Sequence, residues 1–153
     1  MVIENASGSK YKVYAIESKF TEAYRGEGHS GLKGKYLDLA IWNDILHLRE
    51  LAVSISPIDN RFQYLHAAQL IKHILGLKKA YGKTGFRLLY LWYDALGGEG
   101  AKHREEIDEF LETARADGIK VHGLSYQELI IRLAERHRDT HKEYIEYVTS
   151  RYL

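Results

Sequence analysis

The segment Tyr11-Lys12-Val13-Tyr14-Ala15-Ile16-Glu17-Ser18-Lys19 decides the fold class of this 153-residue chain. Its valine, isoleucine and tyrosines favour an extended backbone, so residues 11–18 are predicted to form a β-strand. Residues 2–4 (Val-Ile-Glu) predict a second, shorter strand ahead of it. The intervening Asn-Ala-Ser-Gly-Ser at residues 5–9 is typical of a turn, and together the three pieces predict an N-terminal β-hairpin.

Helical and extended patterns alternate after this hairpin. Apolar residues at steps of three and four predict helices over 36–53, 61–81 and 102–117, and a last helix from residue 125 to about 150. The last helix begins at Ser125 with Glu128, which has the spacing of a capping box. Residues 86–93 are nearly all apolar and predict a central strand covered on both faces, and residues 119–124 predict a short strand. This alternation indicates one α/β domain spanning residues 1–153 with a mixed sheet.

Glu17 and Lys19 are the first candidates for chemistry. Side chains alternate across a strand, so these two residues share one face of the sheet at the end of the strand. A carboxylate can hold a hard divalent cation such as Mg²⁺, and the Ser18 backbone carbonyl could supply a second oxygen ligand. An ammonium beside it can stabilise charge on a phosphoryl oxygen. A plain surface salt bridge is the alternative interpretation of the same pair.

Composition excludes several classes of protein. The chain has no cysteine, so disulfides and thiol catalysis are excluded, and a reducing, cytoplasmic location is expected. No apolar run approaches the ~20 residues of a membrane span, so no membrane association is expected. The formal net charge is only +1, yet residues 61–93 contain no Asp or Glu and six cations. That segment could contact the phosphates of a nucleic acid, or its cations could pair with acids elsewhere in the fold.

The order of these elements resembles the PD-(D/E)XK nuclease-like superfamily, whose members have the restriction-endonuclease fold. The string Ile-Glu-Ser-Lys-Phe-Thr-Glu at residues 16–22 is similar to the Glu-x-Lys form of one bacterial branch, and Gln-Leu-Ile-Lys-His at residues 69–73 resembles its glutamine-bearing helix. The resemblance implies a restriction-endonuclease-like core, a mixed sheet with an N-terminal hairpin flanked by helices. It also implies that Glu17 binds Mg²⁺ or Mn²⁺, that Lys19 is the catalytic lysine, and that Gln69 lies near the site. DNA is the implied partner.

One residue of the superfamily pattern is missing. The pattern requires an acid, normally Asp, on the strand before Glu-x-Lys, but no Asp occurs before Asp38. Either the domain is N-terminally incomplete, or Glu4 on the first hairpin strand takes the place of this acid as a metal ligand. The strand register decides whether Glu4 faces Glu17, and the sequence does not specify it.

Two functions therefore remain open. The first is a Mg²⁺-dependent nuclease that hydrolyses DNA phosphodiester bonds. The second is a catalytically inactive nuclease-like domain that binds nucleic acid or a protein, or that oligomerises. The tyrosines Tyr144, Tyr147 and Tyr152 near the C-terminus make a homodimer one expectation. On the second predicted helix, His66 and His73 share a face with Gln69 and could contact a phosphate or orient a water.

Overall fold

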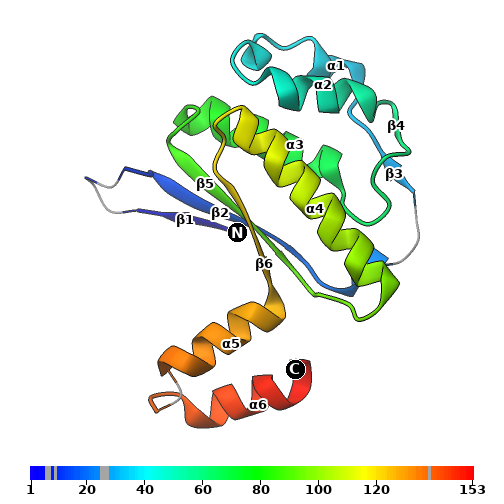
Figure 1. Cartoon of the computed structure of the whole chain (residues 1–153). Coiled ribbons are helices and arrows are strands. Elements are labelled where there is room, and N and C mark those ends of the chain that lie inside the picture. The colour runs from blue at the N-terminus through cyan, green and yellow to red at the C-terminus, as the bar shows by residue number, and fades with distance from the viewer. Residues whose placement is uncertain (6–7, 9, 25–27, 138) are drawn as a thin grey trace.

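A computed structural model describes residues 1–5, 8, 10–24, 28–137 and 139–153. Its main sheet has the order β1-β2-β5-β6, built from Val2–Glu4, Val13–Lys19, Phe86–Trp92 and Val121–Ser125 (Figure 1). β1 runs antiparallel to β2, whereas β5 and β6 run parallel to β2. The predicted hairpin and mixed α/β sheet are therefore confirmed, although residues 6, 7 and 9 of its turn lie outside the described residues.

Helices α3 (Ala67–Tyr81) and α4 (Gly98–Ala116) follow β2 and β5 and cover the same face of the sheet (Figure 1). The side chains of β5 that point to these helices, such as Phe86 and Leu88, are buried, whereas Arg87 and Leu89 between them are partly exposed. The prediction that this strand is covered on both faces was therefore wrong over its first half. Its alternating burial is the pattern of a sheet with one packed face.

The helix predicted over 36–53 is three short pieces, α1 (Gly34–Leu37), a 3₁₀ turn η2 (Ala40–Trp42) and α2 (Leu46–Ser54). Its interruption has a long-range cause. Asp117, which follows α4, is buried, and its carboxylate accepts hydrogen bonds from the backbone N–H groups of His47 and Leu48 at 3.1 and 2.8 Å. These groups lie in the first turn of α2, where backbone donors have no partner within the helix. A residue far along the chain therefore fixes where α2 begins.

The helix predicted over 61–81 begins only at Ala67. The backbone N–H groups of Gln63, Tyr64 and Leu65 donate instead to the carboxylate of Glu106 on α4, at 2.8 to 2.9 Å. A short ribbon of β3 (His29–Ser30) and β4 (Ile58–Asp59) precedes this segment. The structure therefore replaces the first predicted helical turns by a chain segment that is anchored to α4.

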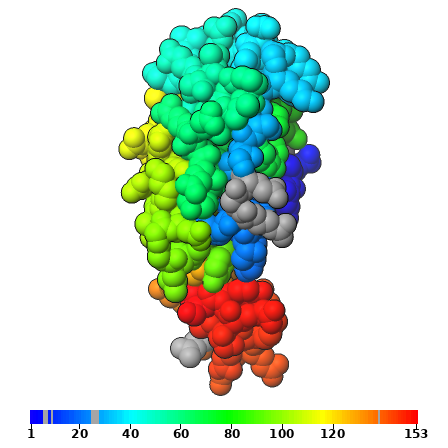
Figure 2. Space-filling view, turned by 90° about the vertical axis from the view of Figure 1, so that its right-hand side faces the viewer, coloured from blue at the N-terminus to red at the C-terminus, as the bar shows by residue number. Residues whose placement is uncertain are grey.

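The predicted last helix divides into α5 (Tyr126–His137) and α6 (Lys142–Tyr152), which pack against each other beyond the end of β6 (Figure 1). The predicted capping box is confirmed, because Glu128 N–H donates to Ser125 Oγ and Ser125 N–H donates to Glu128 Oε2. In the space-filling view α6 covers the end of the molecule away from α1 and α2 (Figure 2). None of the described helices combines the length and hydropathy that a bilayer-spanning segment requires.

Candidate active site

Glu17 and Lys19 lie at the carboxyl end of β2, on the sheet face that α3 covers. In the parallel register Glu17 pairs with Tyr90 and Lys19 with Trp92. The Lys19 ammonium lies 3.7 Å from Glu17 Oε1, and the two side chains keep 21% and 13% of their surface exposed. Neither group is sealed in the apolar interior, so both can reach a bound molecule.

Helix α3 adds two side chains to this pair. Gln69 donates a hydrogen bond through Nε2 to Glu17 Oε1 at 2.7 Å, and His73, one turn further on, places Nδ1 3.2 Å from Glu17 Oε2. One carboxylate oxygen is therefore held by a hydrogen bond from Gln69, and the His73 ring lies beside the other. The structure brings together the predicted residues Glu17, Lys19 and Gln69, and also His73, which shares the helix face of Gln69.

Two residues of this cluster, Glu17 and His73, line a groove of about 330 Å³ between α3 and the β1 edge of the sheet. Glu17, Lys72, His73 and Gly76 line it, together with apolar side chains from β1, β2, α3 and β5: Met1, Val2, Ala15, Ile16, Leu77 and Leu88. The acid thus faces an open, mostly apolar channel that contains a lysine and a histidine. An elongated anionic molecule could approach the carboxylate along it.

Glu4 does not take part in this cluster. The register of β1 places Glu4 opposite Val13, whereas Met1 exchanges backbone hydrogen bonds with Ile16. Glu4 is therefore displaced from Glu17 by four residues along β2, about 13 Å at 3.3 Å per residue. The expectation that Glu4 replaces the missing acid as a metal ligand is corrected by this register.

Ser18 points to the other face of the sheet, where its hydroxyl shares a hydrogen bond with the Tyr126 hydroxyl. Backbone groups of successive strand residues point alternately to the two neighbouring strands. The Lys19 carbonyl accepts from Tyr93 N–H on the β5 side, and both backbone groups of Ile16 bond to Met1 on the β1 side. The Ser18 carbonyl is therefore directed to the β1 side, beyond Met1.

The oxygen atoms at this site supply part of the ligand set that a hard divalent cation needs. Glu17 and the Ser18 carbonyl offer oxygen atoms, which are the ligands that Mg²⁺ prefers. The described residues contain no group of three or more His, Cys, Asp or Glu side chains placed to hold a metal ion. A cation bound at Glu17 would therefore depend on oxygen atoms from another source, such as the phosphates of a substrate.

Most cations of residues 61–93 have partners within the fold. Lys78 and Lys83 both pair with Asp44, at 2.7 and 4.0 Å, and the hydrogen bond from Lys78 lowers the pKa of that carboxyl. Arg61 pairs with Glu109, and Arg87 lies over the Tyr11 ring. The interpretation of these cations as partners of acids elsewhere therefore holds for three of them. Among the described residues, Lys72 and Lys79 form no ion pair.

His66 does not join Gln69 and His73 at the carboxylate. Its ring stacks on His29, with centroids 4.8 Å apart and planes 11° from parallel. Burial, followed by the fields of His29, Lys72 and Lys19, lowers the pKa of His66. The ring is therefore uncharged near neutral pH and packs as an aromatic group between α3 and the β3–β4 ribbon.

A buried hydrogen-bond network behind the site has no signature in the sequence. His103 on α4 is fully buried, with Nδ1 3.0 Å from the Tyr24 hydroxyl and Nε2 3.2 Å from the Tyr90 hydroxyl. The Tyr24 hydroxyl donates to the Tyr93 carbonyl, so His103 Nδ1–H must donate to Tyr24, and Nε2 accepts from Tyr90. Tyr90 is the strand neighbour of Glu17, so this network supports the strand that carries the acid.

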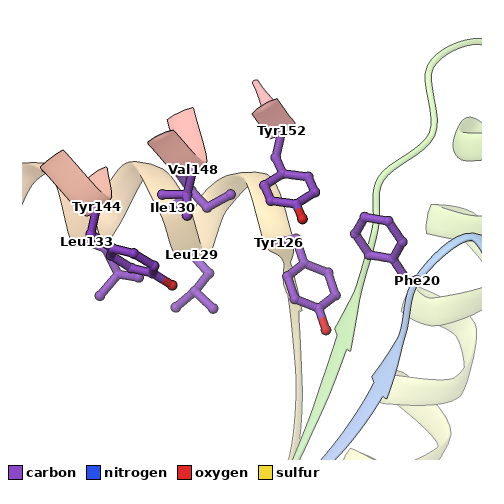
Figure 3. Close-up of a pocket in the computed structure, with 8 residues that line it drawn as sticks. All are labelled: Phe20, Tyr126, Leu129, Ile130, Leu133, Tyr144, Val148 and Tyr152. Atoms are coloured by element: carbon purple, nitrogen blue, oxygen red, sulfur yellow. The ribbon is translucent and has the colours of Figure 1, made fainter. Parts of the chain in front are cut away.

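A second cavity, of about 350 Å³, lies between α5, α6 and Phe20 (Figure 3). Its lining is apolar or aromatic: Phe20, Tyr126, Leu129, Ile130, Leu133, Tyr144, Val148 and Tyr152. The described residues that line it include no carboxylate, amine or imidazole. The Phe20 ring lies 5.4 Å from that of Tyr126 and 5.8 Å from that of Tyr152, which attaches the α5–α6 pair to the residue after Lys19. A homodimer through this tyrosine-rich region stays a prediction.

Fold and site together define an α/β protein with an acid–lysine pair at the carboxyl end of β2 in a mixed sheet and a glutamine from α3, the helix that covers this strand. Comparison with known families matches residues 1–153 to the family described as Restriction Endonuclease associating with ARP, and the chain belongs to this family. No curated protein and no solved structure gives a match. The family membership agrees with a nuclease-like protein and with DNA as its partner.

Proposed function

We propose that this protein is a metal-dependent nuclease of the PD-(D/E)XK type that hydrolyses phosphodiester bonds in DNA. The observation that carries the proposal is the arrangement around Glu17, whose carboxylate accepts a hydrogen bond from Gln69, lies beside Lys19 and His73, and faces an open groove. Glu17 and Lys19 match the Glu-x-Lys part of the superfamily pattern, and Gln69 matches the helix glutamine of the branch that the chain resembles. The family description, which names restriction endonucleases, supports the same reaction class.

The residues have separate tasks in this reaction. Glu17 and the Ser18 carbonyl would hold Mg²⁺ or Mn²⁺, which lowers the pKa of a bound water and polarises the phosphate. The Lys19 ammonium stabilises negative charge that develops on the phosphoryl oxygens as the P–O bond breaks. Gln69 keeps the Glu17 carboxylate in one orientation through its hydrogen bond to Oε1. The reaction consumes one water and leaves a phosphate monoester and a hydroxyl.

An inactive nuclease-like module is the second candidate. One observation favours it: the described residues place only one carboxylate, that of Glu17, in the groove. Such a module would still bind DNA or a protein, but it would not cut DNA. The two candidates therefore differ in a single measurable property, metal-dependent cleavage.

The test is cleavage of supercoiled and linear DNA with Mg²⁺, Mn²⁺ or EDTA. We expect cleavage only with a divalent cation, and a loss of about 100-fold in rate for Glu17→Ala and for Lys19→Ala. Lys79→Ala, which removes an equal charge from the same region outside the groove, serves as the control and should keep the wild-type rate. Cleavage that survives both active-site substitutions would refute the proposal. No cleavage by the wild-type protein with either cation would favour the inactive module.

A further inference from the structure

Gly76 stands in the interior of α3, where glycine destabilises a helix relative to alanine. The usual structural reasons for such a glycine do not apply. Its φ is not positive, and a Cβ built on it would meet no atom of the described residues within 4 Å. Gly76 instead lines the groove that leads to Glu17. The absence of a side chain therefore keeps this groove open.

Lys72 lies one helical turn before Gly76 and lines the same groove. Two other lysines in this part of the chain, Lys78 and Lys83, are held by Asp44, whereas the described residues offer Lys72 no ion pair. Apart from Glu17 itself, the described residues that line the groove include no acid. Lys72 therefore places an uncompensated positive charge beside an open channel, which favours an anionic occupant.

The lining of the groove also suits a sugar-phosphate backbone. Lys72 and Gly76 lie one turn of α3 apart, about 6 Å at 1.5 Å per residue, so a phosphate held by Lys72 would place the neighbouring part of the strand against Gly76. The apolar side chains of Val2, Leu77 and Leu88 offer a surface against which sugar rings can pack.

We propose that the sugar-phosphate backbone of the cleaved DNA strand lies in this groove, in closest contact with α3 at Gly76, with Lys72 binding a phosphate outside the reacting one. The inference rests on the proposed function and adds the path of the substrate to it. A side chain at position 76 would occupy the space of the strand. Loss of the Lys72 charge would remove one phosphate contact without changing the fold.

The steric part of the proposal is tested by DNA binding without metal. Labelled single-stranded and duplex DNA are titrated with wild type, Gly76→Leu and Gly98→Leu in EDTA, and fluorescence anisotropy is measured. Gly98 is the matched control, because it is a helical glycine with open space around it that lies outside the groove. We expect Gly76→Leu to weaken binding by about tenfold, whereas Gly98→Leu stays close to wild type.

Gly76→Ala separates folding from binding. Alanine at a helical position with free space stabilises the folded protein relative to glycine, so the melting temperature should rise. DNA affinity should nevertheless fall, because the new methyl group narrows the groove. If Gly76 served only the fold, the change to alanine would raise the melting temperature without lowering the DNA affinity. If Gly76→Leu fails to fold, Gly76→Ala and the charge test below decide the outcome.

The phosphate contact of Lys72 is tested by measuring DNA affinity at several salt concentrations. Each phosphate contact contributes about 0.7 to 0.9 to the slope of log affinity against log salt concentration. We expect Lys72→Ala to reduce this slope by that amount and Lys79→Ala to leave it unchanged. Wild-type DNA binding that is insensitive to both Gly76→Leu and Lys72→Ala would overturn the groove path and leave the nuclease proposal standing. A wild-type protein that binds no DNA would overturn both.

Discussion

Replacement of Glu106 by alanine is expected to lower the free energy of unfolding by about 4 kcal/mol. The carboxylate is only 2% exposed and accepts three backbone hydrogen bonds, from Gln63, Tyr64 and Leu65. Each buried N–H left without an acceptor costs about 1–3 kcal/mol, and two of these bonds are buried. The segment before α3 would lose its attachment to α4, so the position of Gln69 would change as well.

Urea denaturation of wild type and variants measures this effect. Glu109→Ala is the matched control, because Glu109 lies one turn further along α4 and pairs with Arg61 at the surface. Exposed ion pairs contribute about 0–1 kcal/mol, so this variant should remain close to wild type. Similar losses for the two variants would show that Glu106 does not anchor the segment.

The second large effect is a loss of stability in acid that depends on His103. Burial lowers the pKa of His103 to about 4, from an ordinary value near 6.5. Between these two values the unfolded chain binds a proton that the folded protein excludes, so stability falls as the pH drops from about 6.5 to about 4. The contribution of His103 is about 3 kcal/mol, at 1.36 kcal/mol for each pH unit.

His103→Gln removes this titration and keeps a polar side chain between Tyr24 and Tyr90. We expect the variant to be less stable than wild type at pH 7, but to lose about 3 kcal/mol less between pH 7 and pH 4. The comparison of slopes isolates His103, because the carboxylates and His66 titrate in both proteins. Parallel stability curves for wild type and variant would contradict the assignment of a neutral, buried His103.

Short-range sequence patterns predicted correctly those features that depend on contacts within one element or between neighbouring elements. Strand alternation placed Glu17 and Lys19 on one face, and the spacing of Ser125 and Glu128 located the start of α5. Gln69 lies at the carboxylate because α3 covers the strand that bears the Glu-x-Lys motif. In each case, the decisive interaction is made within one element or between neighbouring layers.

The features that the sequence did not reveal depend on contacts between residues that are far apart in the chain. The start of α2 depends on Asp117 and the start of α3 on Glu106, both of which lie on or next to α4. A helical pattern cannot reveal a carboxylate that arrives from more than 40 residues away. The strand register that separates Glu4 from Glu17, and the pairing of Lys78 with Asp44, likewise appear only in three dimensions.

The parallel pairing of β2 with β5 has a consequence for folding kinetics. The contact between Glu17 and Gln69 joins residues 52 positions apart, and Val13 pairs with Phe86 still further along the chain. Contacts of such high sequence separation form slowly, because the entropy of closing a long loop is lost before the contacts are made. The hairpin of β1 and β2 can form early, but Gln69 reaches Glu17 only when the crossover through α3 has docked. A nascent chain that ends before α3 therefore has the Glu17–Lys19 pair without the side chain that orients the carboxylate.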